Sequence, residues 1–375
     1  DLHSFPTRRS SDLVGANKTT MPILEGILFE VYDHRLFLTS TNLEISIQTS
    51  IPAHVEQDGE LILQSNFIFE LVRKLSGEDV FFEQMAQHQL KMTCECSTFT
   101  IKGMPSDEFP EFPKVIDDYS FTVDAAALKA MIHGTIFAVA IKENIPVLTG
   151  LKLEIEQDQL TMIALDGYRL ALRRGALSTP INEAVSIIVP GKSMMELDKL
   201  LSGVSGDVQV NLSRAQIFFT MGDTQFTSRL LEGEFINYKH IIPKDKNTEV
   251  VIDKKLLLDS TERAALLARE GKNNLIKMAF GIDELTLSSN AEIGDVHEVI
   301  PIQKTGDDLK IAFNSKFIID ALRAIDQEQI TIDMTNPVGP AVILPEDNRY
   351  VYLILPVRVS DAPTRSEERR VGKEC

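Results

Sequence analysis

Three similar stretches decide the fold: SNFIFELVRKL at Ser65–Leu75, GKSMMELDKLL at Gly191–Leu201 and SKFIIDALRAI at Ser315–Ile325. Each opens with a small residue and then places apolar side chains at helical spacing, which predicts an amphipathic helix. Their aligned acids, Glu70, Glu196 and Asp320, lie 126 and 124 residues apart. A fixed spacing of this kind predicts a domain repeated along the chain.

A second motif, a strand that runs into a polar turn, repeats with the same period. Its copies are TSTNLEISI at Thr39–Ile47, IALDGYRLAL at Ile163–Leu172 and LSSNAEIGDV at Leu287–Val296. The aligned residues Asn42, Gly167 and Asn290 lie 125 and 123 residues apart. Two independent motifs with one period indicate three repeats.

A further helix-like stretch occurs only twice, at Val123–Ala140 and Ile252–Ala268, with Asp124 and Asp253 as matching N-cap candidates. One more step back along the chain reaches its first residues. We therefore expect the first repeat to lack its opening strand and helix, with recognisable sequence from about Val14.

The two ends read as foreign sequence. One DNA string that encodes the tail RSEERRVGKEC also encodes HSFPTRRSSD and the start of a Leu codon, on its reverse complement in a shifted frame. Two unrelated natural termini are not expected to share this property, so both are interpreted as translated sequencing adapter. Cys375 falls in this tail and carries no functional weight.

Between the helices the chain is rich in β-branched and aromatic residues with alternating polarity, as at Leu36–Ile47, Leu151–Ile155, Phe218–Leu231 and Tyr350–Val359. The predicted class is α+β, with two helices packed on antiparallel sheet in each of three domains, the first of which lacks its opening strand and helix. Pro-containing linkers are expected at Pro110–Ser120 and Ile241–Thr248. The predicted segments are 1–13 (non-native), 14–120, 121–245, 246–360 and 365–375 (non-native).

Composition narrows the class of protein. The 375 residues exceed what one core usually serves, and 43% hydrophobic with 25% charged residues is ordinary for a soluble globular protein. Three cysteines rule out a disulfide framework and favour a cytoplasmic protein, and the sequence has no membrane-length apolar run. The formal net charge of −17 does not exclude nucleic acid, because only the face that meets phosphates must be positive.

The chain resembles the bacterial sliding clamp family, the beta subunit of DNA polymerase III, and is most similar to clamps of Gram-positive bacteria. The resemblance covers about Val14 to Val359 and is carried by ALDGYRL (Ala164–Leu170), LILPVRV (Leu353–Val359), TMPIL (Thr20–Leu24), DEFPEFP (Asp107–Pro113), AALLARE (Ala264–Glu270) and Phe313–Asn314. It implies a head-to-tail homodimer whose helices line a hole around double-stranded DNA. It also implies a non-catalytic accessory subunit without a cofactor or a metal.

The resemblance implies DNA contacts that hold the duplex without reading its sequence. The candidates are Lys and Arg on the predicted helices, together with two loop lysines: Lys18, Arg73, Lys74, Lys129, Lys142, Lys192, Lys199, Lys254, Arg263, Arg269, Lys316 and Arg323. The alternative is that these cations are only the solvated faces of amphipathic helices.

The resemblance also implies a groove that takes a short apolar peptide from the replicative polymerase, the clamp loader and other replication proteins. The matching positions are Leu148, Leu165, Gly167, Tyr168, Arg169, Leu170, His240, Ile241, Asn314, Phe317, Val338, Leu353, Ile354, Leu355, Pro356, Val357 and Arg358. Gly167 is expected to let the turn tighten, and Arg169 to bond a peptide carbonyl. The alternative is that several of these leucines are ordinary core strand residues.

The resemblance also implies self-association, between the first domain of one copy and the third domain of the other. Phe99 and Ile101, on a predicted edge strand, match one side of this contact, and Leu266 and Leu267 match the other. An apolar edge strand is a pairing hazard unless it has a partner, and closure of a ring supplies one.

Signals for an enzyme are weak. Cys94 and Cys96 form a C-x-C that would place both thiols on one strand face, but a metal site needs further ligands. The sequence has no Walker loop, and Asp166 falls at a repeated turn position where Asx residues brace the backbone. Two other classes stay open: a protein scaffold that uses only the peptide groove, and a hydrolase with an unrecognised site.

Overall fold

The computed structural model describes residues 21–77, 79–115, 118–141, 145–271, 274–345 and 349–358. The predicted foreign segments, and Lys18 and Lys142, lie outside the described residues. The chain divides into two compact units. Unit 1 comprises Asp1–Ala164 with Arg173–Phe235, and unit 2 comprises Leu165–Leu172 with Ile236–Cys375.

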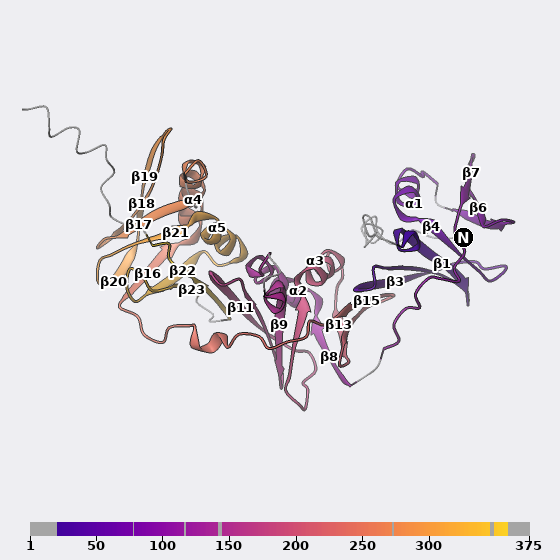
Figure 1. The fold of residues 1–375 in the computed structure, drawn as a ribbon, viewed down its shortest axis with the longest axis horizontal. Helices are drawn as coiled ribbons and strands as arrows, with labels where there is room; N and C mark the ends of the chain where they lie inside the picture. The colour runs from indigo at the N-terminus through magenta and orange to yellow at the C-terminus, as the bar shows by residue number, and fades with distance from the viewer. Residues whose placement is uncertain are drawn as a thin grey trace, which may run out of the picture. The chain divides into compact units, whose positions relative to one another are not determined.

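Unit 1 holds two repeats in succession along the chain (Figure 1). The first contains η1 (Pro22–Glu25), β1 (Gly26–Tyr32), β2 (Arg35–Thr41), β3 (Ile45–Pro52), β4 (Gly59–Gln64), α1 (Ser65–Val72), β5 (Phe81–Met85), β6 (Gln89–Cys94) and β7 (Ser97–Lys102). The second contains β8 (Tyr119–Asp124), α2 (Ala125–His133), η2 (Ile136–Ala138), η3 (Pro146–Thr149), β9 (Gly150–Glu156), β10 (Gln159–Leu165), β11 (Arg169–Ala176), β12 (Val185–Pro190), α3 (Gly191–Leu200), β13 (Asp207–Leu212), β14 (Gln216–Met221) and β15 (Thr224–Arg229).

One eight-stranded antiparallel sheet, in the order β4-β1-β2-β3-β15-β14-β13-β8, runs through both repeats of unit 1. The repeats meet where β3 pairs with β15, from Thr224 opposite Thr49 to Ser228 opposite Ile45. We call this pairing the first junction. A separate sheet, β5-β6-β7, leaves β7 as an edge strand.

Unit 2 holds the third repeat together with the start of β11. Its elements are η4 (Tyr238–His240), β16 (Thr248–Asp253), α4 (Lys254–Ala268), β17 (Leu275–Phe280), β18 (Glu284–Ala291), β19 (Gly294–Pro301), β20 (Gln303–Gly306), β21 (Leu309–Asn314), α5 (Ser315–Ala324), β22 (Gln329–Met334), β23 (Ala341–Pro345) and β24 (Tyr350–Ile354). Strands follow the orders β11-β24-β23-β22-β16-β20 and β19-β18-β17-β21, so β19 is an edge strand. The pairing of β11 with β24 is the second junction.

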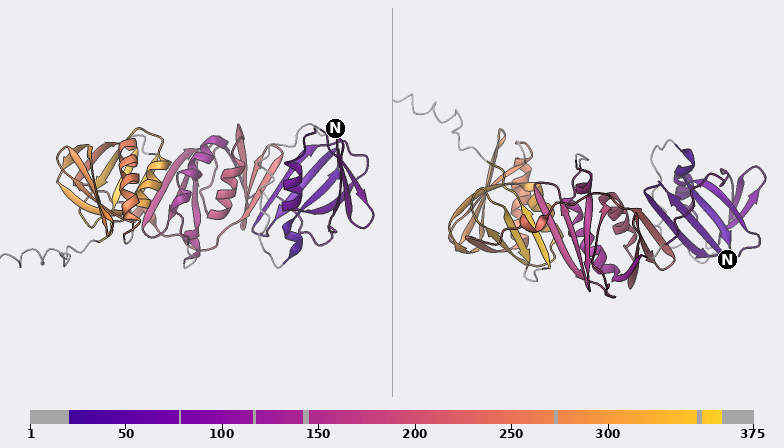
Figure 2. Two further views of the ribbon diagram at one scale, coloured as in Figure 1. Left: turned by 90° about the horizontal axis from the view of Figure 1, so that it is seen from above. Right: turned by 60° about the horizontal axis from the view of Figure 1, so that its bottom comes forward.

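Local chemistry explains where the helices begin. The Asp124 and Asp253 carboxylates accept hydrogen bonds from the backbone N–H groups of Ala127 and Leu256, both at 2.8 Å, and cap α2 and α4. Each helix buries one apolar stripe, as α5 does with Ile318 and Leu322. The helices α2 and α3 pack together in unit 1, and α4 packs against α5 in unit 2, where Figure 2 shows the pair in two views.

The three predicted α+β repeats and their helix starts are confirmed, with several local differences. The helix predicted over Val123–Ala140 ends at His133, where Gly134 follows, and the chain continues as the 3-10 turn η2. The run Leu36–Ile47 is a hairpin of two strands with a turn after Asn42. Within the described residues, which begin at Met21, the first repeat contains α1 as its single α-helix. The predicted lack of an opening strand and helix concerns the chain before Met21 and stays a prediction.

Two predicted details of turns are wrong. Cys94 ends β6 and is buried, whereas Cys96 is exposed in the β6–β7 turn, so the two thiols do not share a strand face. Asn290 lies within the β18–β19 ladder opposite Asp295 and makes no turn. The equivalent pair at the β2–β3 hairpin is Thr41 with Ser46, so Ala291 occupies the position of Asn42.

Candidate functional site

The turn Asp166–Arg169 carries the exposed aromatic residue of the predicted peptide site. Asp166 Oδ1 accepts hydrogen bonds from the backbone N–H groups of Tyr168 (2.9 Å) and Arg169 (3.0 Å), an Asx turn. Gly167 has a φ of +90°, a conformation in which side chains are strained, so the expected tightening at this glycine is confirmed. The turn therefore holds Tyr168 outward, 65% exposed.

Helix α5 supplies the second aromatic ring. Phe317 stacks against Tyr168 with ring centroids 6.4 Å apart, and the Leu355 N–H donates to the Tyr168 carbonyl at 2.8 Å. Leu355 is exposed, so an apolar surface made by Tyr168, Phe317 and Leu355 lies at the second junction. We call these three residues the apolar cluster.

Five of the other predicted peptide-site residues have roles within the fold. Leu165, Leu170, Leu353 and Ile354 are buried strand residues, as the core alternative proposed. The Asn314 side chain caps α5 by accepting from the Lys316 N–H at 3.0 Å.

The remaining positions differ in exposure and are not joined to the apolar cluster by the contacts described for them. Val338 and His240 are exposed, and Ile241, Pro356 and Val357 are half-buried. Arg358 is exposed, and Leu148 is buried within unit 1. Membership of these residues in a peptide site stays a prediction.

Arg169 is held inside unit 2. Its side chain is 5% exposed, and it bonds to Asp166 (Nε to Oδ2, 2.9 Å) and Asp320 (Nη1 to Oδ2, 2.7 Å). Its guanidinium also lies 4.4 Å from the centre of the Phe317 ring. The expected bond from Arg169 to a peptide carbonyl stays a prediction, and in this structure the guanidinium faces its own chain.

Sequence reasoning missed two members of this neighbourhood, Asp320 and Tyr352. In the sequence, Asp320 stands out only as one of three aligned acids. Its pairing with the buried Arg169 is visible only in the structure. Tyr352 is fully buried, and its hydroxyl donates to the Phe317 carbonyl at 2.7 Å. Burial raises the pKa of Tyr352, so this phenol stays protonated and remains a donor.

Most predicted DNA-contacting cations on the helices have partners within the chain. Arg263 binds Glu298 through two hydrogen bonds of 2.7 and 2.8 Å, and Arg323 bonds to Glu262 at 2.7 Å. The other engaged side chains are Lys74 with Glu70, Lys129 with Ser202, Lys199 with Glu196, Lys254 with the Ile325 carbonyl, and Arg73 over the Phe69 ring. Lys192, Arg269 and Lys316 are exposed and have no side-chain partner in the described part of the chain.

The predicted self-association residues lie on the edge strand β7 and on helix α4. Phe99 and Ile101 lie on the edge strand β7, where Ile101 also contributes to the core of the first repeat. Leu266 is exposed on α4 and Leu267 is half-buried.

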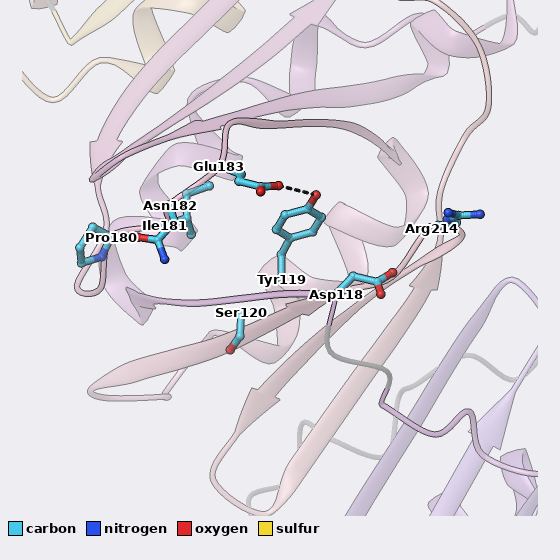
Figure 3. A pocket seen from close by; sticks show the side chains of 8 residues that line it. All are labelled: Asp118, Tyr119, Ser120, Pro180, Ile181, Asn182, Glu183 and Arg214. Carbon is cyan, nitrogen blue, oxygen red and sulfur yellow. Dashed lines mark hydrogen bonds between the residues drawn. The ribbon is translucent and has the colours of Figure 1, made fainter.

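A polar cavity of about 690 Å³ lies in unit 1, away from all predicted site residues (Figure 3). Its lining includes Asp118, Asn182 and Arg214. Tyr119 donates a hydrogen bond to Glu183 at 3.2 Å, and this bond together with the charge of Glu183 raises the pKa of Tyr119. The lining carries charges of both signs, so the cavity points to no particular ligand.

The described residues offer neither a clustered metal site nor a membrane-spanning helix. Among the described residues, no group of three or more His, Cys, Asp or Glu side chains is placed to hold a metal ion. Within the same residues, the helices are too short or too polar to span a membrane.

Comparison with known proteins identifies the family. Models of the DNA polymerase III beta subunit match in three consecutive parts: the N-terminal domain at residues 12–113, the central domain at 122–237 and the C-terminal domain at 239–358. The chain therefore belongs to the DNA polymerase III beta-subunit family.

Individual proteins similar to this chain belong to the same family. The chain is 35% identical to the beta sliding clamp of Bacillus subtilis over 355 residues, covering 92% of this chain and 94% of that protein. It is also 35% identical to the beta sliding clamp of Staphylococcus aureus, covering 91% of this chain and 93% of that protein. The crystal structure of the Bacillus subtilis sliding clamp superimposes with a TM-score of 0.90 at 34% identity, covering 94% of this chain and 97% of that one. The Thermotoga maritima beta subunit gives 0.87 at 30% identity, covering 94% and 96%.

Proposed function

We propose that this chain is a DNA sliding clamp: two copies close head to tail around duplex DNA and tether the replicative polymerase, the clamp loader and other replication proteins. It acts in the cytoplasm as an accessory subunit without catalysis of its own. The family membership carries this proposal, and three features of the chain support its parts.

The first feature is the placement of free positive charge. The chain has a formal net charge of −17, yet Lys192 and Lys316, at equivalent positions of α3 and α5, have no side-chain partner among the described residues. Isolated lysines attract phosphates without the bidentate contacts that read bases. Such contacts suit a protein that must move along DNA.

The second feature is that the free edges of the chain are repeat equivalents of strands that pair inside it. Strand β7 follows β6 through the same tight turn by which β15 follows β14, with Cys94 opposite Ser97 and Met221 opposite Thr224. Strand β19 likewise corresponds to β3. Because β3 pairs with β15, we infer that β19 of one copy pairs with β7 of the other.

The first junction also supplies the register of this contact. Phe226 lies opposite Ile47 there, and their equivalents are Phe99 and Val296. The same equivalence brings Phe67 of one copy towards Ile293 of the other. These side chains are 50% and 72% exposed in the single chain, and burial of apolar area would favour the dimer.

The third feature is the apolar cluster at the second junction. Asn42 makes the same Asx turn as Asp166, so it corresponds to Asp166, one residue away from the Gly167 with which the sequence aligned it. The equivalents of Tyr168, Phe317 and Leu355 at the first junction are then Glu44, Ser193 and Arg229, which are polar. Ser193 there accepts a hydrogen bond from Ser228 at 2.7 Å and is buried. The chain thus offers an apolar surface at one junction and a polar one at the other, which supports a single peptide site per copy.

A topological experiment tests the proposal. The clamp is loaded onto nicked circular DNA, and retention is measured by gel filtration at high salt before and after the circle is linearised. We expect retention on the circle and loss from the linear form, because an encircling ring is held by closure and not by ion pairs. Salt-dependent loss that is equal on both DNAs would reject encirclement and favour a scaffold that uses only the peptide site.

Substitution of the free lysines should weaken the electrostatic contact with DNA. For Lys316→Ala, we expect the slope of log affinity against log salt on linear duplex to fall by about 1. Arg323→Ala, on the same helix, is the matched control, because Arg323 is already paired with Glu262 and should change the slope less. Equal effects of the two substitutions would show that the intrachain pair does not restrain Arg323.

A further inference from the structure

The environment of Arg169 joins two segments that are far apart in the sequence. One carboxylate partner, Asp166, lies in the turn that carries Tyr168, and the other, Asp320, lies on α5 one helical turn after Phe317. A buried guanidinium needs such partners, and its planar fork can engage two carboxylates at once. We call Asp166, Arg169 and Asp320 the clasp.

The clasp contacts the Phe317 ring and the backbone of Tyr168. Asp166 uses Oδ2 for Arg169 and Oδ1 for the backbone N–H of Tyr168, so one carboxylate fixes the guanidinium and the turn together. The guanidinium lies over the Phe317 ring at 4.4 Å, and Tyr168 stacks on the same ring. The clasp thus links the turn that carries Tyr168 to the ring of Phe317.

Arg169 supplies the positive charge of the clasp. Burial lowers the pKa of Arg169, but the hydrogen bond to Asp320, the nearby Tyr352 and the bond to Asp166 outweigh it, so the pKa lies above its usual value. Arg169 stays charged wherever the protein is folded.

The first junction shows that strand pairing does not require a clasp. The backbone bond from Leu355 N–H to the Tyr168 carbonyl (2.8 Å) has an equivalent there, from Arg229 N–H to the Glu44 carbonyl (2.9 Å). The residue equivalent to Arg169 at the first junction is Ile45, which is buried and apolar. Glu196, equivalent to Asp320, bonds to Lys199 on its own helix. The junction with a clasp is thus the one with exposed aromatic rings.

We propose that Arg169 is a positioning residue, which locks the turn 166–169 to α5 and so presents Tyr168 and Phe317 as a rigid surface for the apolar side chains of a partner peptide. This inference rests on the proposed peptide site. Arg169 contributes to binding by fixing the position of the two rings. A fixed surface binds more tightly because the ordering of the two rings is not lost on binding.

The absence of tryptophan from the sequence gives a local probe. Tyr168→Trp places a single indole at the surface, and its fluorescence anisotropy reports ring motion in the chain without peptide. In this background, Asp320→Leu should lower the anisotropy, since the turn loses its link to α5. Asp320→Asn, which keeps an acceptor for Arg169, should stay near the parent value. Glu196→Leu, at the equivalent position of the first junction, is the matched control and should leave the anisotropy unchanged.

Peptide titration gives the second readout. With a synthetic peptide that carries Leu and Phe, we expect affinity to fall about tenfold for Asp320→Leu and little for Asp320→Asn. If Asp320→Leu does not fold, Arg169→Met combined with Asp320→Leu removes the link to α5, while Asp166 Oδ1 still accepts the backbone N–H groups of the turn. Unchanged anisotropy and unchanged affinity in the clasp-free chain would overturn the inference. If the parent binds no peptide, the proposed peptide site fails, while the anisotropy still decides the role of the clasp.

Discussion

Replacing Thr100 with proline should weaken the proposed dimer about tenfold or more. At the first junction, Arg229 N–H donates to the Glu44 carbonyl and Ser50 N–H donates to the Asp223 carbonyl. By repeat equivalence, the N–H groups of Lys102, Thr100 and every second residue of β7 point outward, towards the partner. Proline removes one of these donors and tolerates an edge position, so the fold of the single chain is preserved.

The size of the effect follows from the lost hydrogen bond. A buried carbonyl left without its donor costs about 1–3 kcal/mol, so the dimer dissociation constant should rise about tenfold or more. Light scattering over a dilution series should then show the fall from about twice 41.9 kDa to 41.9 kDa at a concentration about tenfold or more higher for the variant than for the parent chain.

The matched control for this experiment is Thr100→Ala, which keeps the backbone N–H and should remain dimeric. Circular dichroism and thermal unfolding of both variants establish that β7 is folded. A folded Thr100→Pro chain with undiminished dimerisation would refute the pairing of β7 with β19. The same variant should lose the retention on circular DNA, which links the edge strand to encirclement.

Replacing Tyr168 with alanine should remove most of the affinity for an apolar partner peptide. Exposed aromatic side chains at the centre of an interface commonly contribute about 2 kcal/mol or more, which corresponds to roughly thirtyfold in affinity. Tyr168 is 65% exposed, so the free energy of unfolding should change by only about 1 kcal/mol or less. Isothermal titration calorimetry with the Leu- and Phe-containing peptide measures the binding.

Glu44→Ala supplies the internal control for this substitution, because Glu44 holds the equivalent turn position at the first junction. It should leave peptide binding unchanged. Equal losses from Tyr168→Ala and Glu44→Ala would mean that the peptide does not distinguish the two junctions. Binding that survives Tyr168→Ala would remove the apolar cluster from the peptide site.

Periodicity predicted the repeated elements well because it depends on local physics. The helices at Ser65, Gly191 and Ser315 begin where the small residues indicated, and Asp124 and Asp253 cap helices as expected. Predictions that depended on strand register were less accurate. Asn290 was assigned to a turn on its similarity to Asn42, although the β18–β19 ladder extends one residue further and displaces the turn.

The predicted sites divide in the same way. Sequence similarity selected Tyr168, Phe317 and Leu355, which the structure brings together. It did not distinguish exposed residues from buried ones, so Leu165 and Leu353 joined the same list although both lie in the core. Arg169 and Asp320 lie 151 residues apart, and neither local pattern signals a partner at that distance.

By itself, the sequence determined that this protein is built from three α+β repeats of one period, and the resemblance it carries determined the family. Helix caps, turn residues and apolar spacing act over a few residues and can be read directly from the chain. Only the tertiary structure decided which repeated positions differ in role. It made Tyr168 exposed and Leu170 buried, paired Arg263 with Glu298 while leaving Lys316 free, and held Arg169 between two carboxylates. Burial and ion pairing depend on contacts between residues distant in the sequence, and those contacts exist only once the chain has folded.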